Sequence, residues 1–170
     1  MRCFHNMILT ALVPVEKPGW VFRWIFKIPV FLNIIRLDSL IPGWMLLLMH
    51  VGRKTGRRRV TPLEYIYQSE DNTYRVMSGW RGNTDWYKNI ICNPEVIIKV
   101  NGKTVRAVAR KLTEDEVLEY LIEILRINPE AIHIFSRWAG RTIEPTLDNL
   151  KEACVHFPGA ALTPSDNLPN

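Results

Sequence analysis

The stretch WMLLLMHV (residues 44–51), GRKTGRRR (52–59) and VTPLEYIY (60–67) decides the fold. The outer two segments predict β-strands and the middle one a turn. Gly52 and Gly56 can adopt positive φ without a Cβ clash, so a short turn there can present backbone N–H groups. Five basic side chains within seven residues add charge-assisted donors suited to phosphate or carboxylate. The turn therefore indicates an anion site, with a solvated basic hairpin that prevents edge pairing as the alternative.

The rest of the chain predicts further antiparallel strands. Asn101-Gly102 is the preferred two-residue hairpin turn. Short turns between neighbouring strands imply antiparallel pairing. Pro158 and Gly159 weaken the last strand or confine it to an edge of the sheet. The strands are expected at residues 44–51, 58–68, 73–78, 96–100, 103–112 and 155–164.

Helices are expected around these strands. Asn83 or Thr84 caps a short helix that runs to Cys92 and is terminated by Asn93-Pro94. Thr113 and Glu116 form a capping box that opens a longer one. Two more helices are expected at residues 129–140 and 145–153. About six antiparallel strands with helices at the edges indicate an α+β fold, either a small barrel or a sandwich.

The composition fits one globular domain. The chain has 170 residues, of which 47% are hydrophobic and 23% charged. The net charge of +5 favours an anionic partner, such as a phosphorylated cofactor, a membrane surface or nucleic acid. Three cysteines match no disulfide or metal framework and indicate a reducing, cytosolic compartment. The four histidines form no pair at metal-ligand spacing, so we expect no metal site.

The N-terminal part contains a basic amphipathic segment. Residues 18–37 predict a helix, bent at Pro29, with apolar positions at helical spacing. Charged residues interrupt the segment, so it does not qualify as a transmembrane span. It either covers a sheet or dimer face or lies on a membrane surface. We expect a cytoplasmic protein, with peripheral membrane contact through residues 18–37 as an option.

A second polar and aromatic cluster follows the third strand. It comprises the segments SGW (residues 78–80) and DWYKN (85–89). The rings of Trp86 and Tyr87 offer flat faces for stacking, and a helix start offers backbone N–H groups to an anion. Asn89 follows Asp85 by one helical turn, so the two share a face. An aromatic pair in the core is the alternative interpretation.

Together these motifs resemble the deazaflavin-dependent nitroreductase family. The resemblance covers about residues 44–118 and rests on the segments at 52–56, 59–63 and 86–89 in combination. It implies an α+β split β-barrel of about six mostly antiparallel strands with peripheral helices. Residues 1–170 would form a single domain. Its parts would be an N-terminal segment (1–40), barrel strands and cofactor site (41–112), helices (113–154), a last strand (155–164) and a tail (165–170).

The resemblance implies a hydride-transfer oxidoreductase that uses reduced 8-hydroxy-5-deazaflavin coenzyme. By family analogy the phosphate and anionic tail would be held by Arg53, Lys54, Thr55 and Arg59. The stem would lie on Val60 and Thr61. The ring system and phosphate would lie along Met77, Ser78, Gly79, Trp86, Tyr87, Lys88 and Asn89. This chain lacks the lysine of the Ser-Lys-Gly-Gly segment that many members carry. Either Trp80 or Arg81 would replace its function, or the coenzyme would sit differently.

The expected acceptor is a small, flat, conjugated molecule such as a nitro-compound, quinone or enone. Glu64, Tyr65 and Trp80 would line its pocket, and Ser78 would contact an acceptor oxygen. Glu64 stands where some members carry an aromatic residue. We assign no catalytic acid or base, because the cofactor would carry the chemistry. A homodimer is also expected from the family.

Two other functions fit parts of the same pattern. An FMN-binding oxidase or reductase would share the barrel. A non-enzymatic module would use residues 53–59 on an anion, nucleic acid or acidic lipid. The nucleic-acid version is the weaker, because stacking residues do not interleave with the basic run and no recognised motif is present.

Overall fold

The computed structural model of the chain describes residues 43–165. Its strands form one sheet in which each neighbouring pair is antiparallel. The order across the sheet is β2-β1-β5-β6-β7-β4-β3. The strands are β1 (Met45–Val51), β2 (Arg58–Glu64), β3 (Ile66–Gln68), β4 (Thr73–Met77), β5 (Glu95–Val100), β6 (Lys103–Lys111) and β7 (Gly159–Pro164).

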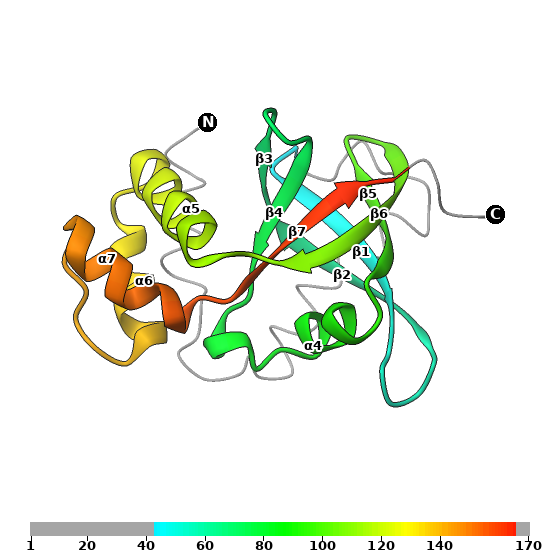
Figure 1. Ribbon diagram of the computed structural model, residues 1–170, viewed down its shortest axis with the longest axis horizontal. Helices are drawn as coiled ribbons and strands as arrows, with labels where there is room; N and C mark the ends of the chain where they lie inside the picture. The colour runs from blue at the N-terminus through cyan, green and yellow to red at the C-terminus, as the bar shows by residue number, and fades with distance from the viewer. Residues whose placement is uncertain (1–42, 166–170) are drawn as a thin grey trace.

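The sheet is curled because its two edge strands are almost consecutive in the chain. β2 and β3 lie at opposite edges, yet only Tyr65 separates them. Two peptide steps span at most about 7 Å, so the two edges must meet. Figure 1 shows the resulting curvature of the strands. The α+β split-barrel prediction is confirmed.

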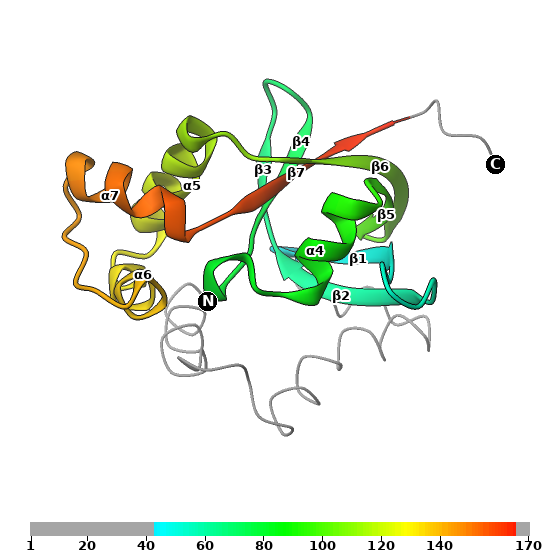
Figure 2. The same ribbon diagram turned by 60° about the horizontal axis from the view of Figure 1, so that its bottom comes forward.

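Helices pack outside this sheet. Figures 1 and 2 show α5, α6 and α7 gathered together beyond one end of the strands, while α4 lies apart from them. The three gathered helices have their own apolar core, which includes Leu121, Phe135 and Phe157. The barrel core includes Leu46, Ile98 and residues of α4. The helices are α4 (Asp85–Cys92), α5 (Glu114–Ile127), α6 (Ala131–Ala139) and α7 (Leu147–Ala153), with 3₁₀ turns η2 (Trp80–Gly82) and η3 (Cys154–His156).

Local sequence motifs correctly predicted several of these elements. Asn101 (φ 48°) and Gly102 (φ 75°) form the expected tight turn between β5 and β6. Thr113 and Glu116 form the expected capping box of α5, with both reciprocal hydrogen bonds present. Thr84 occupies the N-cap position of α4, as one of the two predicted options, but its side chain makes no capping bond.

The single strand expected at residues 58–68 is wrong, because it breaks at Tyr65. Up to Glu64 the chain pairs with β1, and from Ile66 it pairs with β4. The count of strands within residues 43–165 is therefore seven, one more than about six. A single strand cannot occupy both edges, so the break is the point at which the barrel closes.

The last strand was also placed inaccurately. It begins at Gly159 and lies inside the sheet, between β6 and β4. Pro158 precedes the strand, so its missing N–H removes no bond from the strand itself. A Cβ at Gly159 would stand 2.6 Å from Leu112 Cδ1 and 2.8 Å from the Val76 carbonyl oxygen. Glycine is thus required there by close packing and does not indicate an edge.

The N-terminal predictions lie outside the described residues. These include the segment 18–37, with its membrane-contact option, and most of the tail expected at 165–170. Between residues 43 and 165, no helix combines the length and hydropathy needed to cross a membrane.

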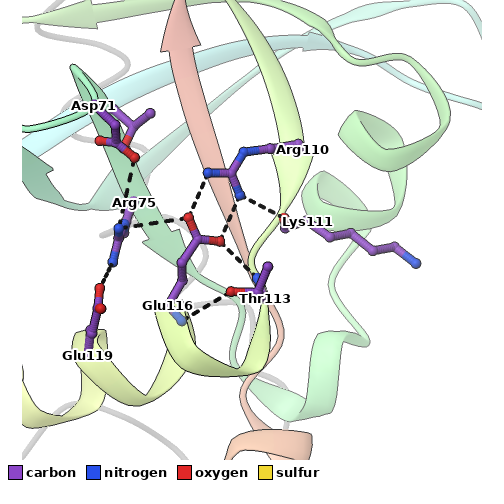
Figure 3. A network of polar contacts seen from close by, with 8 residues as sticks. Asp71, Arg75, Arg110, Lys111, Thr113, Glu116 and Glu119 are labelled. Carbon is purple, nitrogen blue, oxygen red and sulfur yellow. Dashed lines mark hydrogen bonds and ion pairs between the residues drawn. The ribbon is translucent and has the colours of Figure 1, made fainter.

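A charged network ties α5 to the sheet (Figure 3). Glu116 accepts hydrogen bonds from Arg110 at 2.6 and 2.7 Å and lies 3.7 Å from Arg75. Arg75, from β4, is also paired with Glu119 at 2.7 Å and with Asp71 at 3.9 Å. The hydrogen bonds from Arg110, the Thr113 N–H and the two guanidinium charges lower the pKa of Glu116 to about 2. The network therefore stabilises the fold as long as Glu116 is ionised.

Replacing Glu116 with Gln should lower the free energy of unfolding by about 1–3 kcal/mol at pH 7. Because the folded pKa lies below the ordinary value of 4.5, the contribution of Glu116 is complete above pH 4.5 and disappears as the pH falls toward 2. Urea unfolding should show that the difference in free energy of unfolding between wild type and variant decreases as the pH falls from 4.5 toward 2. Glu123→Gln, in an exposed pair with Arg126, is the control and should change little. A pH-independent loss in the Glu116 variant would contradict this role.

Candidate functional site

The basic turn between β1 and β2 is compact. The Gly52 N–H donates to the Arg57 carbonyl at 2.9 Å, and the N–H groups of Thr55 and Gly56 donate to the Gly52 carbonyl at 3.1 and 2.8 Å. Gly56 has φ +62°, and a Cβ at Gly52 would stand 2.9 Å from Thr55 Oγ1. The expected set of free backbone N–H groups is therefore not formed, because these donors serve the turn itself. Anion binding here depends on side chains.

Arg53 fastens the turn to α4. Its backbone N–H and its Nη1 both donate to Asn89 Oδ1, at 3.0 and 2.9 Å. Its guanidinium also donates to Asp85 Oδ1, with both nitrogens at 3.1 Å. Asp85 and Asn89 thus share the helix face that their spacing predicts. The charge of Arg53 is partly neutralised by Asp85, which leaves other side chains to attract an anion.

A hollow of about 200 Å³ lies between the turn and α4. We call it the basic hollow. Lys54 and Arg59 are its other cations, and within residues 43–165 neither forms an ion pair. They are therefore the side chains best placed to pair with a bound anion. The hollow is lined by Gly52, Arg53, Lys54, Thr55, Arg59, Asp85 and Asn89.

The side chain of His50 positions the amide of Asn89. This side chain is buried, with Nδ1 3.2 Å from Asn89 Nδ2 and Nε2 3.1 Å from Thr61 Oγ1. Because Asn89 Oδ1 already accepts from Arg53, the amide must donate to Nδ1, and Nε2–H then donates to Thr61. Burial, reinforced by the charge of Arg59 and partly opposed by the Val51 backbone, lowers the pKa of His50. The neutral ring therefore orients the amide of Asn89.

A second, larger cavity of about 440 Å³ is mostly apolar. We call it the apolar cavity. Tyr120, from α5, is buried beside it, and burial together with the Glu64 charge raises the pKa of its hydroxyl, which stays protonated at neutral pH. The lining comprises Trp44, Thr61, Pro62, Leu63, Glu64, Tyr65, Ile66, Met77, Gly79, Trp80, Thr84, Trp86, Tyr120, Ile124, Ile127, Asn128, Ala131, Ile134, Phe135 and Trp138.

The two spaces share two elements, β2 and α4. Arg59 lines the basic hollow and Thr61, two residues further along β2, lines the apolar cavity. Two residues of strand span about 7 Å. On α4, Asn89 faces the hollow while Trp86 faces the cavity. The arrangement fits a long molecule that is flat and apolar at one end and anionic at the other, as the deazaflavin coenzyme is.

The structure separates the predicted site residues into three groups. The basic hollow is lined by Arg53, Lys54, Thr55, Arg59 and Asn89. The apolar cavity is lined by Thr61, Met77, Gly79, Trp86 and the expected acceptor residues Glu64, Tyr65 and Trp80. The residues that line neither space are Val60, Ser78, Tyr87 and Lys88.

These four residues have other surroundings. Val60 is half-buried on β2, opposite Met49 of β1. The Ser78 side chain is fully buried, and its Oγ lies 2.7 Å from Thr84 Oγ1. Tyr87 packs in the barrel core, with its ring in edge contact with Trp86. Lys88 is exposed and donates to Asn83 Oδ1. Thr84, which lines the apolar cavity, thus links the Ser78 hydroxyl to that space. The binding roles of all the predicted residues stay predictions.

Sequence reasoning missed the contribution of α5 and α6 to the apolar cavity. One face of α5 lines this cavity. Tyr120, Ile124 and Ile127 recur on it at four- and three-residue spacing, which was the available signal. His50 was expected to be a packed or surface residue, and it is packed. No cluster of three or more metal-ligating side chains occurs in the described part of the chain.

Replacing His50 with Gln should flatten the pH dependence of stability. The folded pKa lies below the ordinary 6.5, so the unfolded chain takes up the proton first as the pH falls. The stability contribution is complete above pH 6.5 and declines below it. Between pH 7.5 and pH 5.5, urea unfolding should show a larger decrease in the free energy of unfolding for wild type than for the variant. Equal losses would mean that His50 is not held neutral, since the other histidines affect both proteins alike.

The chain resembles known proteins in sequence and in fold. A family model described as F420H(2)-dependent quinone reductase matches residues 36–145. A structure titled F420-H2 dependent reductase (FDR-A) is 19% identical, covers 70% of this chain and 93% of its own, and has a TM-score of 0.50. A structure described as a domain-swapped dimer is 17% identical over 82% of this chain and 97% of its own, with a TM-score of 0.52.

A third similar structure is Atu2129 from Agrobacterium tumefaciens, of unknown function. It is 16% identical, covers 88% of this chain and 57% of its own, and has a TM-score of 0.50. At these identities the structures show a shared fold. The family model matches more than half of the sequence and confirms the resemblance to deazaflavin-dependent reductases. The chain therefore belongs to the F420H(2)-dependent quinone reductase family, a family of oxidoreductases that use the deazaflavin coenzyme F420.

Proposed function

We propose that this oxidoreductase reduces a small, flat, conjugated acceptor, with a quinone as the first candidate and nitro-aromatic and enone molecules as related ones. In the overall reaction a hydride and a proton pass from the reduced coenzyme to the quinone, which leaves as the hydroquinone. The observation that carries the proposal is the adjacency of the basic hollow and the apolar cavity along β2 and α4. One long ligand can occupy both spaces.

We assign the basic hollow to the anionic part of the coenzyme. Lys54 and Arg59 would pair with phosphate or tail oxygens, and Thr55 offers a hydroxyl donor. Arg53 and Asn89, which are hydrogen-bonded to one another, would form a preorganised wall of this site. Because that wall is hydrogen-bonded before the ligand arrives, little side-chain conformational freedom is lost on binding.

We assign the apolar cavity to the ring system and the acceptor together. Trp86 on α4 and Met77 on β4 offer apolar surface, and Thr61 lies two residues along β2 from Arg59 of the hollow. Apolar walls exclude water and favour neutral, conjugated molecules over charged ones. Ser78 would act on this space through Thr84, since its hydroxyl contacts Thr84 and is buried.

Two features of the proposal concern the whole molecule. A homodimer is supported by the similar structure described as a domain-swapped dimer. Light scattering on the purified protein would measure it directly. A cytoplasmic location and a membrane contact through residues 18–37 stay predictions from the sequence.

Lys54→Ala and Arg59→Ala should each weaken binding of the reduced coenzyme by about tenfold, through loss of one charge-assisted contact. The melting temperature should barely change, since both side chains are exposed. Arg57→Ala and Arg58→Ala are matched controls, because they remove the same charge from the same segment without lining the hollow. Coenzyme fluorescence during titration gives the dissociation constants.

The same titration with FMN separates the alternative functions. Tight binding of FMN without the deazaflavin would move the function to flavin chemistry. Equal weakening in all four variants would mean that net charge alone attracts the ligand. Binding of neither cofactor, with retention on DNA or acidic vesicles at moderate salt, would favour the non-enzymatic module.

A further inference from the structure

Unpartnered hydrogen-bond donors gather around the apolar cavity. Within residues 43–165, four buried side-chain nitrogens have no partner, namely Arg75 Nε, Trp80 Nε1, Asn128 Nδ2 and Trp138 Nε1. The last three belong to residues that line the apolar cavity. Buried donors are nearly always paired, and a concentration of unpaired ones calls for a specific explanation. A ligand whose acceptor atoms reach these buried nitrogens from the cavity would supply the missing partners.

The indole of Trp80 is held in place by a strained turn. Trp80 and Arg81 have φ of 51° and 53°, a region that bulky residues rarely adopt. Arg81 Nη2 donates to the Ala139 carbonyl at the end of α6, which pins the turn to that helix. The Trp80 and Trp138 ring centroids are 5.9 Å apart. The strain is therefore maintained by contacts that bring the two indoles together.

Gly79 allows this approach. A Cβ there would stand 3.3 Å from Cζ2 and 3.4 Å from Cη2 of Trp138, closer than an ordinary contact. The segment SGWRG (residues 78–82) is also where this chain departs from the Ser-Lys-Gly-Gly pattern. In this chain the segment holds an aromatic donor, Trp80, beside a second aromatic donor, Trp138.

Asn128 supplies a third donor with a fixed orientation. Its side chain is only 3% exposed, and its Oδ1 accepts from the Glu130 N–H at 3.2 Å. The remaining atom of the amide is therefore the Nδ2 donor, which has no partner. All three groups donate and none accepts, so an acceptor such as a carbonyl oxygen matches them and an ammonium group, which only donates, does not.

These donors lie on the wall formed by η2, α5 and α6, whereas the basic hollow shares only β2 and α4 with the cavity. A coenzyme anchored in the hollow thus leaves this wall to the acceptor. We propose that the indole N–H groups of Trp80 and Trp138, with the amide of Asn128, donate hydrogen bonds to carbonyl oxygens of the acceptor. They would select a flat carbonyl compound over a hydrocarbon of the same shape. This inference rests on the proposed function.

The test compares two ligands of one ring skeleton. The full-length protein is titrated with menadione, which has two carbonyl groups, and with 2-methylnaphthalene, which has none, following the remaining tryptophan fluorescence. Trp80→Phe and Trp138→Phe keep an aromatic ring and remove the donor. Each should weaken menadione binding about five- to tenfold, the effect of one lost hydrogen bond. Each should leave 2-methylnaphthalene binding within about twofold, because apolar contact persists.

The outcomes separate this inference from the proposed function. Equal losses for both ligands would mean that the tryptophans only shape the cavity, and unchanged menadione binding in both variants would mean that they do not contact the carbonyls. Either result would overturn the inference, even if wild type oxidises the reduced coenzyme with menadione. Selective loss of menadione binding would support the inference even if that turnover is absent, which would contradict the proposed function alone. Melting temperatures confirm that each variant is folded.

Discussion

The whole arrangement depends on the closure of the sheet at Tyr65. Because one residue connects strands at opposite edges, the sheet has no freedom to stay open. Closure brings β2 toward the segment that follows β4, although the two are remote in the order of the sheet. Residues 61–66 can then line one cavity together with Met77, Gly79 and Trp80. Tyr65 itself is fixed by its N–H on the Trp44 carbonyl, at 3.3 Å, and by its hydroxyl on the Gly43 carbonyl, at 2.8 Å.

A short helix then divides the site into a polar and an apolar half. α4 has only eight residues, yet it contributes to both spaces and to the barrel core. Ile90 buries it against the sheet, and Asn89 joins it to the basic turn through Arg53 and to β1 through His50. A continuous line of hydrogen bonds thus runs from Thr61 through His50 and Asn89 to Arg53. Coenzyme binding and the stability of this end of the barrel are therefore expected to be coupled.

Much of this could be predicted from local signals. Asn101-Gly102, the capping box at Thr113 and the glycines of the basic turn each specify their backbone through short-range sterics or hydrogen bonds. Most of the residues that the family motifs predicted also line one of the two spaces. The break at Tyr65 could not be read, because residues 58–68 have uninterrupted strand character and only the pairing partners change. The position of β7 inside the sheet could not be predicted for a related reason. Gly159 is required by close packing against Leu112, a residue remote in the sequence, and that contact is not visible in the local pattern.

The site was harder to predict than the fold in one particular respect. Sequence motifs group residues by proximity along the chain, and Ser78, Tyr87 and Lys88 were included because they adjoin residues that do line the cavity. Helical geometry turns Tyr87 and Lys88 away, and Ser78 is buried behind Thr84. The far wall comes from α5 and α6, whose contribution depends on how the helical layer packs against the barrel end. No local motif carries that information.

The most direct test of the central claim is a crystal structure of the full chain with the deazaflavin coenzyme bound. The claim is that the basic hollow and the apolar cavity form one coenzyme site joined by β2 and α4. The account predicts the phosphate or anionic tail beside Lys54 and Arg59, with the ring system in the apolar cavity near Trp86. A coenzyme whose anionic part lies away from this hollow, or whose ring lies outside the cavity, would contradict it.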